Sequence, residues 1–155
     1  MNGYSVKGLR TFATPDGGGY NVDLYRDGVK VAHAFEGGFG GEVELQFVNP
    51  TESKKFYDTI ATLKYKFDGK EYTHSAETFI GELIEVIAEA QDAKKFEARI
   101  KRNCKKVIVV HYKEDGPESF RTFKIPYSAQ SIAKVKELYG HKIDKVYNEE
   151  FGIFA

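Results

Sequence analysis

The side chains best suited to nucleophilic or metal chemistry are one cysteine and four histidines. Cys104 is the only cysteine, and the histidines are His33, His74, His111 and His141. No H-x-x-x-H or H-E-x-x-H pair occurs, and a single thiol cannot build a zinc cage from local ligands. We therefore expect no metal site and no cofactor.

Cys104 lies in the sequence Lys-Arg-Asn-Cys-Lys-Lys, where the neighbouring cations favour the thiolate. A Cys104 nucleophile paired with His74 or His111 is therefore one covalent chemistry that the sequence leaves open. However, no nucleophile motif surrounds Cys104. His111 alternates with Val107 and Val109 on a predicted buried strand, which favours a hydrogen-bonded core histidine. We predict no catalytic residues, and a cysteine-dependent enzyme is the less favoured alternative.

Four glycines surround one aromatic residue in the run Gly-Gly-Phe-Gly-Gly at positions 37–41. A dinucleotide-binding G-x-G-x-x-G loop would need glycine at position 43, where Val43 stands, and it would need a following helix. The sequence after the run instead alternates like a strand, so we interpret the run as a turn that uses the wide backbone freedom of glycine. Phe39 at its tip either folds onto the core or is an exposed anchor for a protein partner.

Charge is balanced overall but uneven along the chain. The whole chain has 23 basic and 23 acidic residues, which argues against general attraction to nucleic acid or to an anionic membrane. Residues 16–44 hold six acidic and two basic side chains, whereas residues 92–106 hold seven basic and two acidic ones. We predict a partner-binding surface in the acidic segment, made of Glu36, Phe39, Glu42 and Glu44.

The basic segment supports an alternative function, the binding of nucleic acid or a small nucleotide. Lysine and arginine bind phosphates with an affinity that does not depend on base sequence. The candidate residues are Lys101, Arg102, Lys105 and Lys106. Aromatic residues are sparse in residues 94–106, so a solvated helix end is the competing interpretation of the same charges.

Apolar periodicity predicts an α+β fold that begins with an antiparallel β-meander. Residues 20–25 and 42–47 alternate with a period of two, and Asp27-Gly28 is typical of a two-residue type I′ hairpin. With residues 5–13 as the first strand and a turn over residues 15–19, residues 1–49 form four strands. Asn49-Pro50 ends this unit. A short helix follows to about Thr62, capped by Thr51 or Ser53.

The remaining residues predict a second Asp-Gly hairpin, two helices and further strands. Asp68-Gly69 joins two short strands, and apolar residues from Phe79 to Ala90 have helical spacing, with a basic end at residues 94–102. We then expect a β-hairpin, a helix with Ser128 as N-cap and Gly140 as stop, and a final strand over residues 142–147. The buried stripe of that helix comprises Ile132, Val135 and Leu138.

Length and composition favour one domain in a reducing compartment. A chain of 155 residues, 41% hydrophobic, can build one core, so we expect residues 1–155 to form a single domain in which the meander (1–49) and the mixed α/β part (50–155) share that core. A lone cysteine and the lack of an apolar leader segment predict a cytoplasmic protein. The longest apolar run, residues 107–110, is too short for a membrane span.

The segment YNVDLYRDGVKVAHAFEGGFGGEVEL, with its flanking strands, resembles an N-terminal module of small uncharacterised proteins from bacteriophages and mobile elements. In that module an Asp-Gly hairpin and a Lys-Val-Ala strand lead into an acidic Gly-Gly loop. The resemblance covers residues 5–48, and the module has Asp-Asp or Asp-Gly where this chain has Phe35-Glu36.

The resemblance implies a phage-encoded accessory protein that acts in the cytoplasm of the host cell. Such proteins are often counter-defence factors, for example anti-CRISPR inhibitors that bind a host effector, or sponges that sequester a signalling nucleotide. No residue role carries over with it. Together with the residues, it predicts a non-enzymatic inhibitor that binds a host protein effector.

Overall fold

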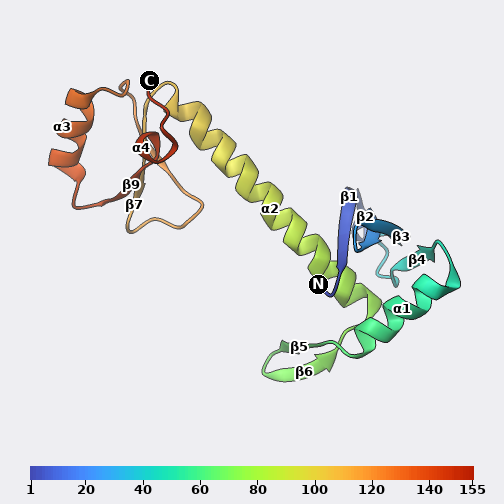
Figure 1. Cartoon of the computed structure of the whole chain (residues 1–155). Coiled ribbons are helices and arrows are strands. Elements are labelled where there is room, and N and C mark those ends of the chain that lie inside the picture. The colour runs from blue at the N-terminus through green and yellow to red at the C-terminus, as the bar shows by residue number, and fades with distance from the viewer. The chain divides into compact units, whose positions relative to one another are not determined.

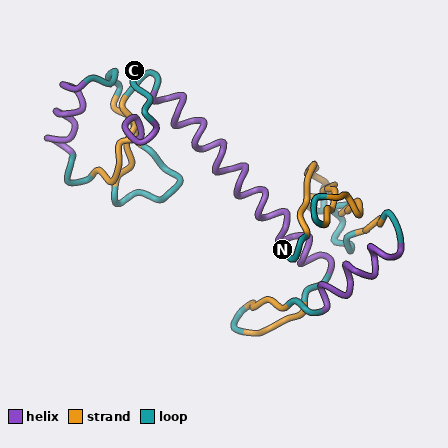
Figure 2. The backbone as a smooth tube through the Cα atoms, in the orientation of Figure 1, coloured by secondary structure: helices purple, strands orange, loops and turns teal.

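The computed structural model describes residues 1–155, and they form two compact units, residues 1–89 and 90–155. Figures 1 and 2 show the elements, and each unit is described here by itself. The division falls inside one helix, α2 (Ala76–Cys104). Strands and helices occur in both units, which confirms the α+β class. That the chain acts as a single domain stays a prediction.

Length and composition suggested one shared core, but the buried side chains form three separate clusters. One cluster lies within residues 1–89, and two others lie within residues 90–155. The apolar helical spacing continues along α2 beyond the part of the helix whose side chains are buried. Phe79, Ile80 and Leu83 are buried, whereas every side chain from Glu89 to Lys95 is exposed, including Ala90 of the expected buried stripe.

The first unit begins with the expected four-stranded antiparallel meander. Its strands pair in the order β1 (Tyr4–Thr14), β2 (Gly17–Arg26), β3 (Val29–Glu36) and β4 (Glu44–Phe47). Asp27 and Gly28 have φ angles of 50° and 82°, as a type I′ turn requires. The turn expected over residues 15–19 is shorter. Gly17, Gly18 and Gly19 already pair with β1, since glycine also accepts extended backbone.

Two helices cover the inner face of this sheet. Helix α1 (Pro50–Ala61) starts two residues earlier than a Thr51 cap would allow, because the Asn49 side chain accepts a hydrogen bond from the Glu52 amide at 2.9 Å and Pro50 occupies the first turn. The predicted caps, Thr51 and Ser53, were therefore wrong. The core between sheet and helices is aromatic: the rings of Tyr4, Phe56 and Phe79 meet edge to face.

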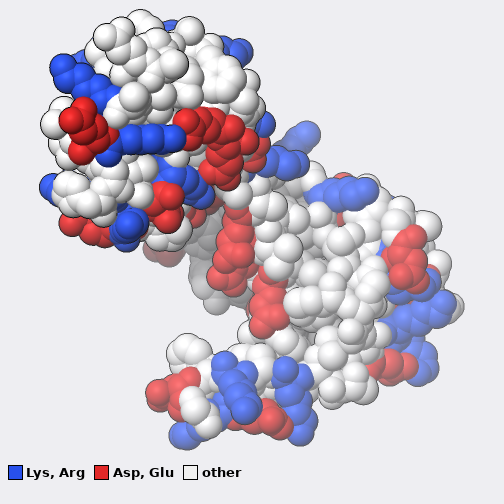
Figure 3. All heavy atoms as spheres, turned by 60° about the vertical axis from the view of Figure 1, so that its left-hand side comes forward, with Lys and Arg blue, Asp and Glu red and all other residues white.

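A second hairpin, β5 (Lys64–Phe67) and β6 (Lys70–Thr73), lies between α1 and α2. Its turn is Asp68-Gly69, with φ angles of 51° and 74°, as the sequence predicted. The hairpin forms its own two-stranded sheet and extends away from the meander in both Figure 1 and Figure 3. Most of its side chains are exposed.

In the second unit the end of α2 leads into a three-stranded sheet. The strand order is β8 (Arg121–Phe123), β7 (Ile108–Tyr112), β9 (Ile143–Val146), so β7 is central. All five β7 side chains are buried because both faces of the strand are covered. Ile108, Val110 and Tyr112 contribute to one cluster with helix α3 (Ala129–Tyr139), and Val109 contributes to another with Cys104.

The predicted limits of α3 are confirmed, but its predicted stripe is only partly so. The Ser131 amide donates to the Ser128 side chain at 3.0 Å, and Gly140 ends the helix. Ile132 and Val135 are buried, whereas Leu138 is 54% exposed and lines a surface pocket with Phe123 of the edge strand β8.

The chain ends with a short helix that the sequence did not predict, α4 (Tyr147–Phe151). Its Asn148 is fully buried and uses its whole amide. The side-chain nitrogen donates to the carbonyl oxygens of Cys104 (3.2 Å) and Val107 (2.9 Å), and the oxygen accepts from the Val109 amide (2.7 Å). Asn148 therefore joins α4 to the end of α2 and to β7.

A long apolar helix is missing from this fold: none of the helices combines the length and the hydropathy needed to cross a bilayer.

Candidate functional site

The glycine loop between β3 and β4 is held in place by its own backbone and two side chains. The Glu36 carboxylate accepts a hydrogen bond from the Gly38 amide at 3.0 Å, and the Thr14 hydroxyl donates to the Gly38 carbonyl at 2.8 Å. Gly38 has a φ angle of 77°, and a Cβ atom there would lie 2.9 Å from Thr14 Cγ2. Only glycine fits both that backbone angle and that close approach.

Phe39 at the tip of this loop is exposed, with 71% of its surface accessible. The sequence left two outcomes open, and the ring does not fold onto the core. Gly37 lies between Phe39 and Phe35: a Cβ atom on Gly37 would be 3.4 Å from Phe39 Cδ2 and 3.6 Å from Phe35 Cε1. Phe35 in turn stacks on Phe12, with ring centres 6.1 Å apart.

Phe12, Phe35 and Phe39 together form an exposed surface that we call the aromatic patch. Phe12 and Phe35 are each 36% exposed and lie on the outer face of the meander. Neither ring was among the site residues predicted from the sequence. Two features indicate that these rings are exposed. Phe35 alternates along β3 with the buried Ala34, and Phe12 stands opposite Gly19, which has no side chain to cover the ring.

The three predicted acidic residues have different roles in the structure. Glu42 and Glu44 are exposed and form no ion pair, and Glu44 stands directly opposite Phe35 in the β3–β4 ladder. Glu36 is half-buried, and its carboxylate is turned toward the Gly38 amide. Glu44 therefore adds free negative charge next to the aromatic patch and Glu42 adds it in the wall of the neighbouring cavity, whereas Glu36 shapes the loop.

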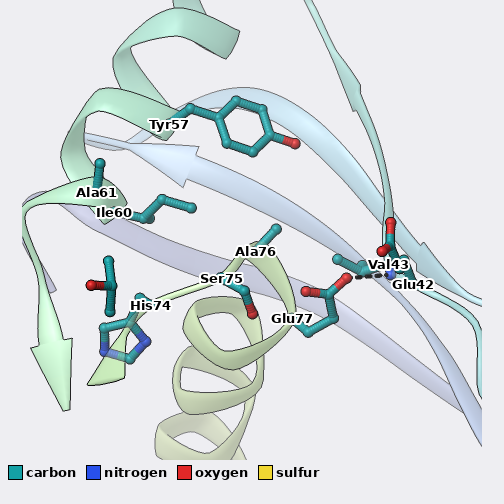
Figure 4. Close-up of a pocket in the computed structure, with 10 residues that line it drawn as sticks. Glu42, Val43, Tyr57, Ile60, Ala61, His74, Ser75, Ala76 and Glu77 are labelled. Atoms are coloured by element: carbon teal, nitrogen blue, oxygen red, sulfur yellow. Dashed lines mark hydrogen bonds between the residues drawn. The ribbon is translucent and has the colours of Figure 1, made fainter. Parts of the chain in front are cut away.

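A cavity of about 430 Å³ lies beside this loop, where α2 begins (Figure 4). Glu42 and Val43 contribute one wall, and Tyr57, His74 and Glu77 contribute others. Glu77 accepts a hydrogen bond from the Val43 amide at 3.2 Å. Hydrogen bonds from its own backbone amide, from Ser75 and from Val43 lower the pKa of Glu77, so this wall stays negative.

His74 in this cavity is a structural residue rather than a free base. Its side chain is 4% exposed, its Nδ1 lies 3.1 Å from the Thr78 hydroxyl, and its Nε2 lies 3.6 Å from a Glu82 oxygen. The ring also packs on Tyr65 and Phe79. The sequence did not predict this cavity, because its walls come from three segments that only the fold brings together.

The alternative basic site is only partly free. Lys101 forms an ion pair with Glu97, and its ammonium group lies 5.0 Å from the centre of the Phe151 ring. Arg102, Lys105 and Lys106 are exposed and form no ion pair. Three of the four predicted cations therefore remain available to an anion.

Cys104 is fully buried, so the expected thiolate is wrong. The side chain packs with Ile100, Val109 and Tyr147, and this loss of solvent raises the pKa of the thiol. His111 confirms the prediction of a hydrogen-bonded core histidine: its Nε2 donates to the Gly116 carbonyl at 3.0 Å, and its Nδ1 lies 3.1 Å from an Asp144 oxygen. No three metal-ligating side chains lie together.

Comparisons of this chain with protein-family models, with curated proteins and with solved structures found no match.

Proposed function

We propose that this chain is a non-enzymatic binding protein whose aromatic patch docks on a basic surface of a protein partner and inhibits it. The observation that supports this most strongly is Phe39, which is 71% exposed on a loop that two hydrogen bonds and a close-packed glycine hold in one conformation. A large aromatic ring kept in water on an ordered loop is typical of an interface anchor.

The order of the loop supports binding because little freedom is lost on association. Immobilising a flexible side chain or loop costs part of the interaction energy, and a loop held by Glu36 and Thr14 has already lost that freedom. The neighbouring Phe35, and Phe12 stacked on it, extend the apolar contact area beyond Phe39.

The charge around the patch favours a basic partner. Glu44 carries a free carboxylate opposite Phe35, and Glu42 and Glu77 add two more in the adjacent cavity. Complementary charge raises the association rate and selects among partners more than it adds affinity. A protein surface that normally binds phosphates has this chemistry. The resemblance of residues 5–48 to phage accessory proteins adds that the partner is a host defence effector.

The test is affinity capture from bacterial lysate with nuclease present, read by mass spectrometry, using three forms of the full chain. Wild type and Phe67→Ala, which removes a ring of almost equal exposure (70%), are expected to retain one stoichiometric protein. Phe39→Ala is expected to lose it, since truncating an anchor costs about 2 kcal/mol or more, or about 30-fold in Kd.

Two results would refute this function. One is equal capture by Phe39→Ala and wild type. The other is a loss of several kcal/mol in the free energy of unfolding of Phe39→Ala, because an exposed ring should contribute no more than about 0.5 kcal/mol to folding. Glu42→Gln and Glu44→Gln together should slow association while leaving dissociation nearly unchanged.

A further inference from the structure

The β5–β6 hairpin carries an exposed aromatic face that the core does not use. Tyr65 and Tyr72 are direct cross-strand partners, and their rings stack with centres 5.6 Å apart. Phe67 lies on the same face, two residues along β5, because alternate residues of a strand share a face. Phe67 is 70% exposed and Tyr72 is 41% exposed.

Contacts of His74 attach the base of the hairpin to the core of the first unit. The His74 amide donates to the Leu63 carbonyl at 3.0 Å, which continues the pairing below the strands. The His74 ring lies 4.9 Å from Tyr65 and 5.8 Å from the buried Phe79, measured between ring centres. A row of rings thus runs from the core to the free end, and only the outer rings remain in water.

The charges on the hairpin are mostly basic once its ion pair is set aside. Lys64 and Glu71 pair with each other at 3.0 Å. Lys66 and Lys70 form no ion pair, and Lys70 stands opposite Phe67 on the aromatic face. Asp68, in the turn, is the only acidic residue left unpaired in the hairpin. Lys70 therefore places one free ammonium group on the aromatic face, whereas Lys66, which stands opposite Glu71, lies on the other face of the hairpin.

We propose that this hairpin binds single-stranded nucleic acid, with bases stacked on Phe67 and Tyr72 and a phosphate held by Lys70. Exposed aromatic rings interleaved with cations are the features that single-strand-binding surfaces share, because every base has a face to stack and every nucleotide has a phosphate. Lysine is depleted from protein interfaces relative to other surfaces, so the same features suit a protein partner less well.

The hairpin and the aromatic patch differ in charge, which separates their ligands. Phe39 and Phe67 have nearly equal exposure; Phe39 lies in the glycine loop, and Phe67 is the last residue of β5, next to the Asp68-Gly69 turn. The patch that contains Phe39 has the free carboxylate of Glu44 opposite Phe35, whereas Phe67 faces Lys70. A polyphosphate chain is attracted to the second ring and repelled from the first.

The proposal is tested by fluorescence anisotropy of labelled 15-mers, oligo(dT) and oligo(rU), titrated with the full chain at about 50 mM salt. Phe67→Ala and Tyr72→Ala should each weaken binding about 5-fold or more. Lys70→Ala should lower the slope of log affinity against log salt by about 0.7, from one lost phosphate contact, whereas Lys66→Ala on the other face should change that slope little. Phe39→Ala is the matched control and should bind like wild type.

The two oligonucleotides also distinguish DNA from RNA as the source of the strand, since either can stack. The proposal is overturned if wild type binds neither oligonucleotide, or if the variants on the aromatic face, with unchanged circular dichroism, bind as tightly as wild type. It is also overturned if binding is lost only when Arg102, Lys105 and Lys106 are replaced by alanine, which would place the site in the basic segment. Protein capture that depends on Phe39 is unaffected by any of these outcomes.

Discussion

Replacing Asn148 by alanine should destabilise the second unit more than almost any other single polar substitution. The side chain is fully buried, and its amide makes three hydrogen bonds, to Cys104, Val107 and Val109. Each hydrogen bond contributes about 1 kcal/mol net, and the Val109 amide would be left buried without a partner. We expect the free energy of unfolding to fall by about 3–4 kcal/mol, a large part of the 5–15 kcal/mol typical of a domain.

The assay is urea unfolding together with hydrogen exchange at single amides. Asn148→Ala should lower the urea midpoint and remove protection from Val109 and its neighbours in β7. Asn148→Asp keeps the shape of the side chain and one acceptor oxygen, but it places a second oxygen against the carbonyls of Cys104 and Val107. It should therefore lower the free energy of unfolding at least as much as Asn148→Ala does. Because its volume is nearly unchanged, this variant separates the effect of the lost hydrogen bonds from that of the lost volume. Asn103→Ala is the control, because its side chain donates one exposed hydrogen bond, to Arg99.

The reasoning fails if Asn148→Ala costs less than about 1 kcal/mol, since the amide would then contribute no more than a single exposed bond. It also fails if Asn103→Ala costs as much.

Two further predictions concern the first unit. Arg26 donates to both Glu52 oxygens, at 2.7 and 2.9 Å, and this lowers the pKa of Glu52. The pair therefore stabilises the fold above the ordinary carboxyl pKa, and that contribution is lost as pH falls through the lowered value, so the urea midpoint should drop in acid and drop less in Glu52→Gln. Gly38→Ala and Gly40→Ala both strain a positive φ, but only Gly38 lies against Thr14. Gly38→Ala should therefore cost about 1 kcal/mol more in unfolding free energy and weaken partner capture; equal losses by both variants would contradict the close approach.

The features that the sequence predicted correctly are those that depend on neighbours in the chain. Asp27-Gly28 and Asp68-Gly69 form tight turns because few other residue pairs accept two consecutive positive φ angles. Ser128 caps α3 through an amide three residues away. Strand alternation identified the meander because one of its faces is covered and the other is wet.

The features that the sequence did not predict depend on residues far away in the chain. Cations next to Cys104 suggested a thiolate, but burial against Val109 and Tyr147 outweighs them. Phe39 is exposed beside Phe35 and Phe12 because of strand register, which glycine freedom alone does not determine. The polar sequence Tyr-Asn-Glu-Glu-Phe is typical of an exposed segment, so it does not predict that Asn148 is buried. Its hydrogen-bond partners lie 39 to 44 residues earlier in the chain.

The two covered faces of β7 also bear on how the unfolded chain behaves. A strand that is dry on both sides needs apolar residues at every position, so Val107–Val110 is a short β-prone run without charge, the kind of segment that stacks with copies of itself when exposed. Lys105 and Lys106 precede the run, and Lys113 follows it. These lysines act as gatekeepers, because stacked copies would bring like charges together at both ends. Truncations that remove β9 and α4 would uncover the run and leave those three charges as its protection against aggregation.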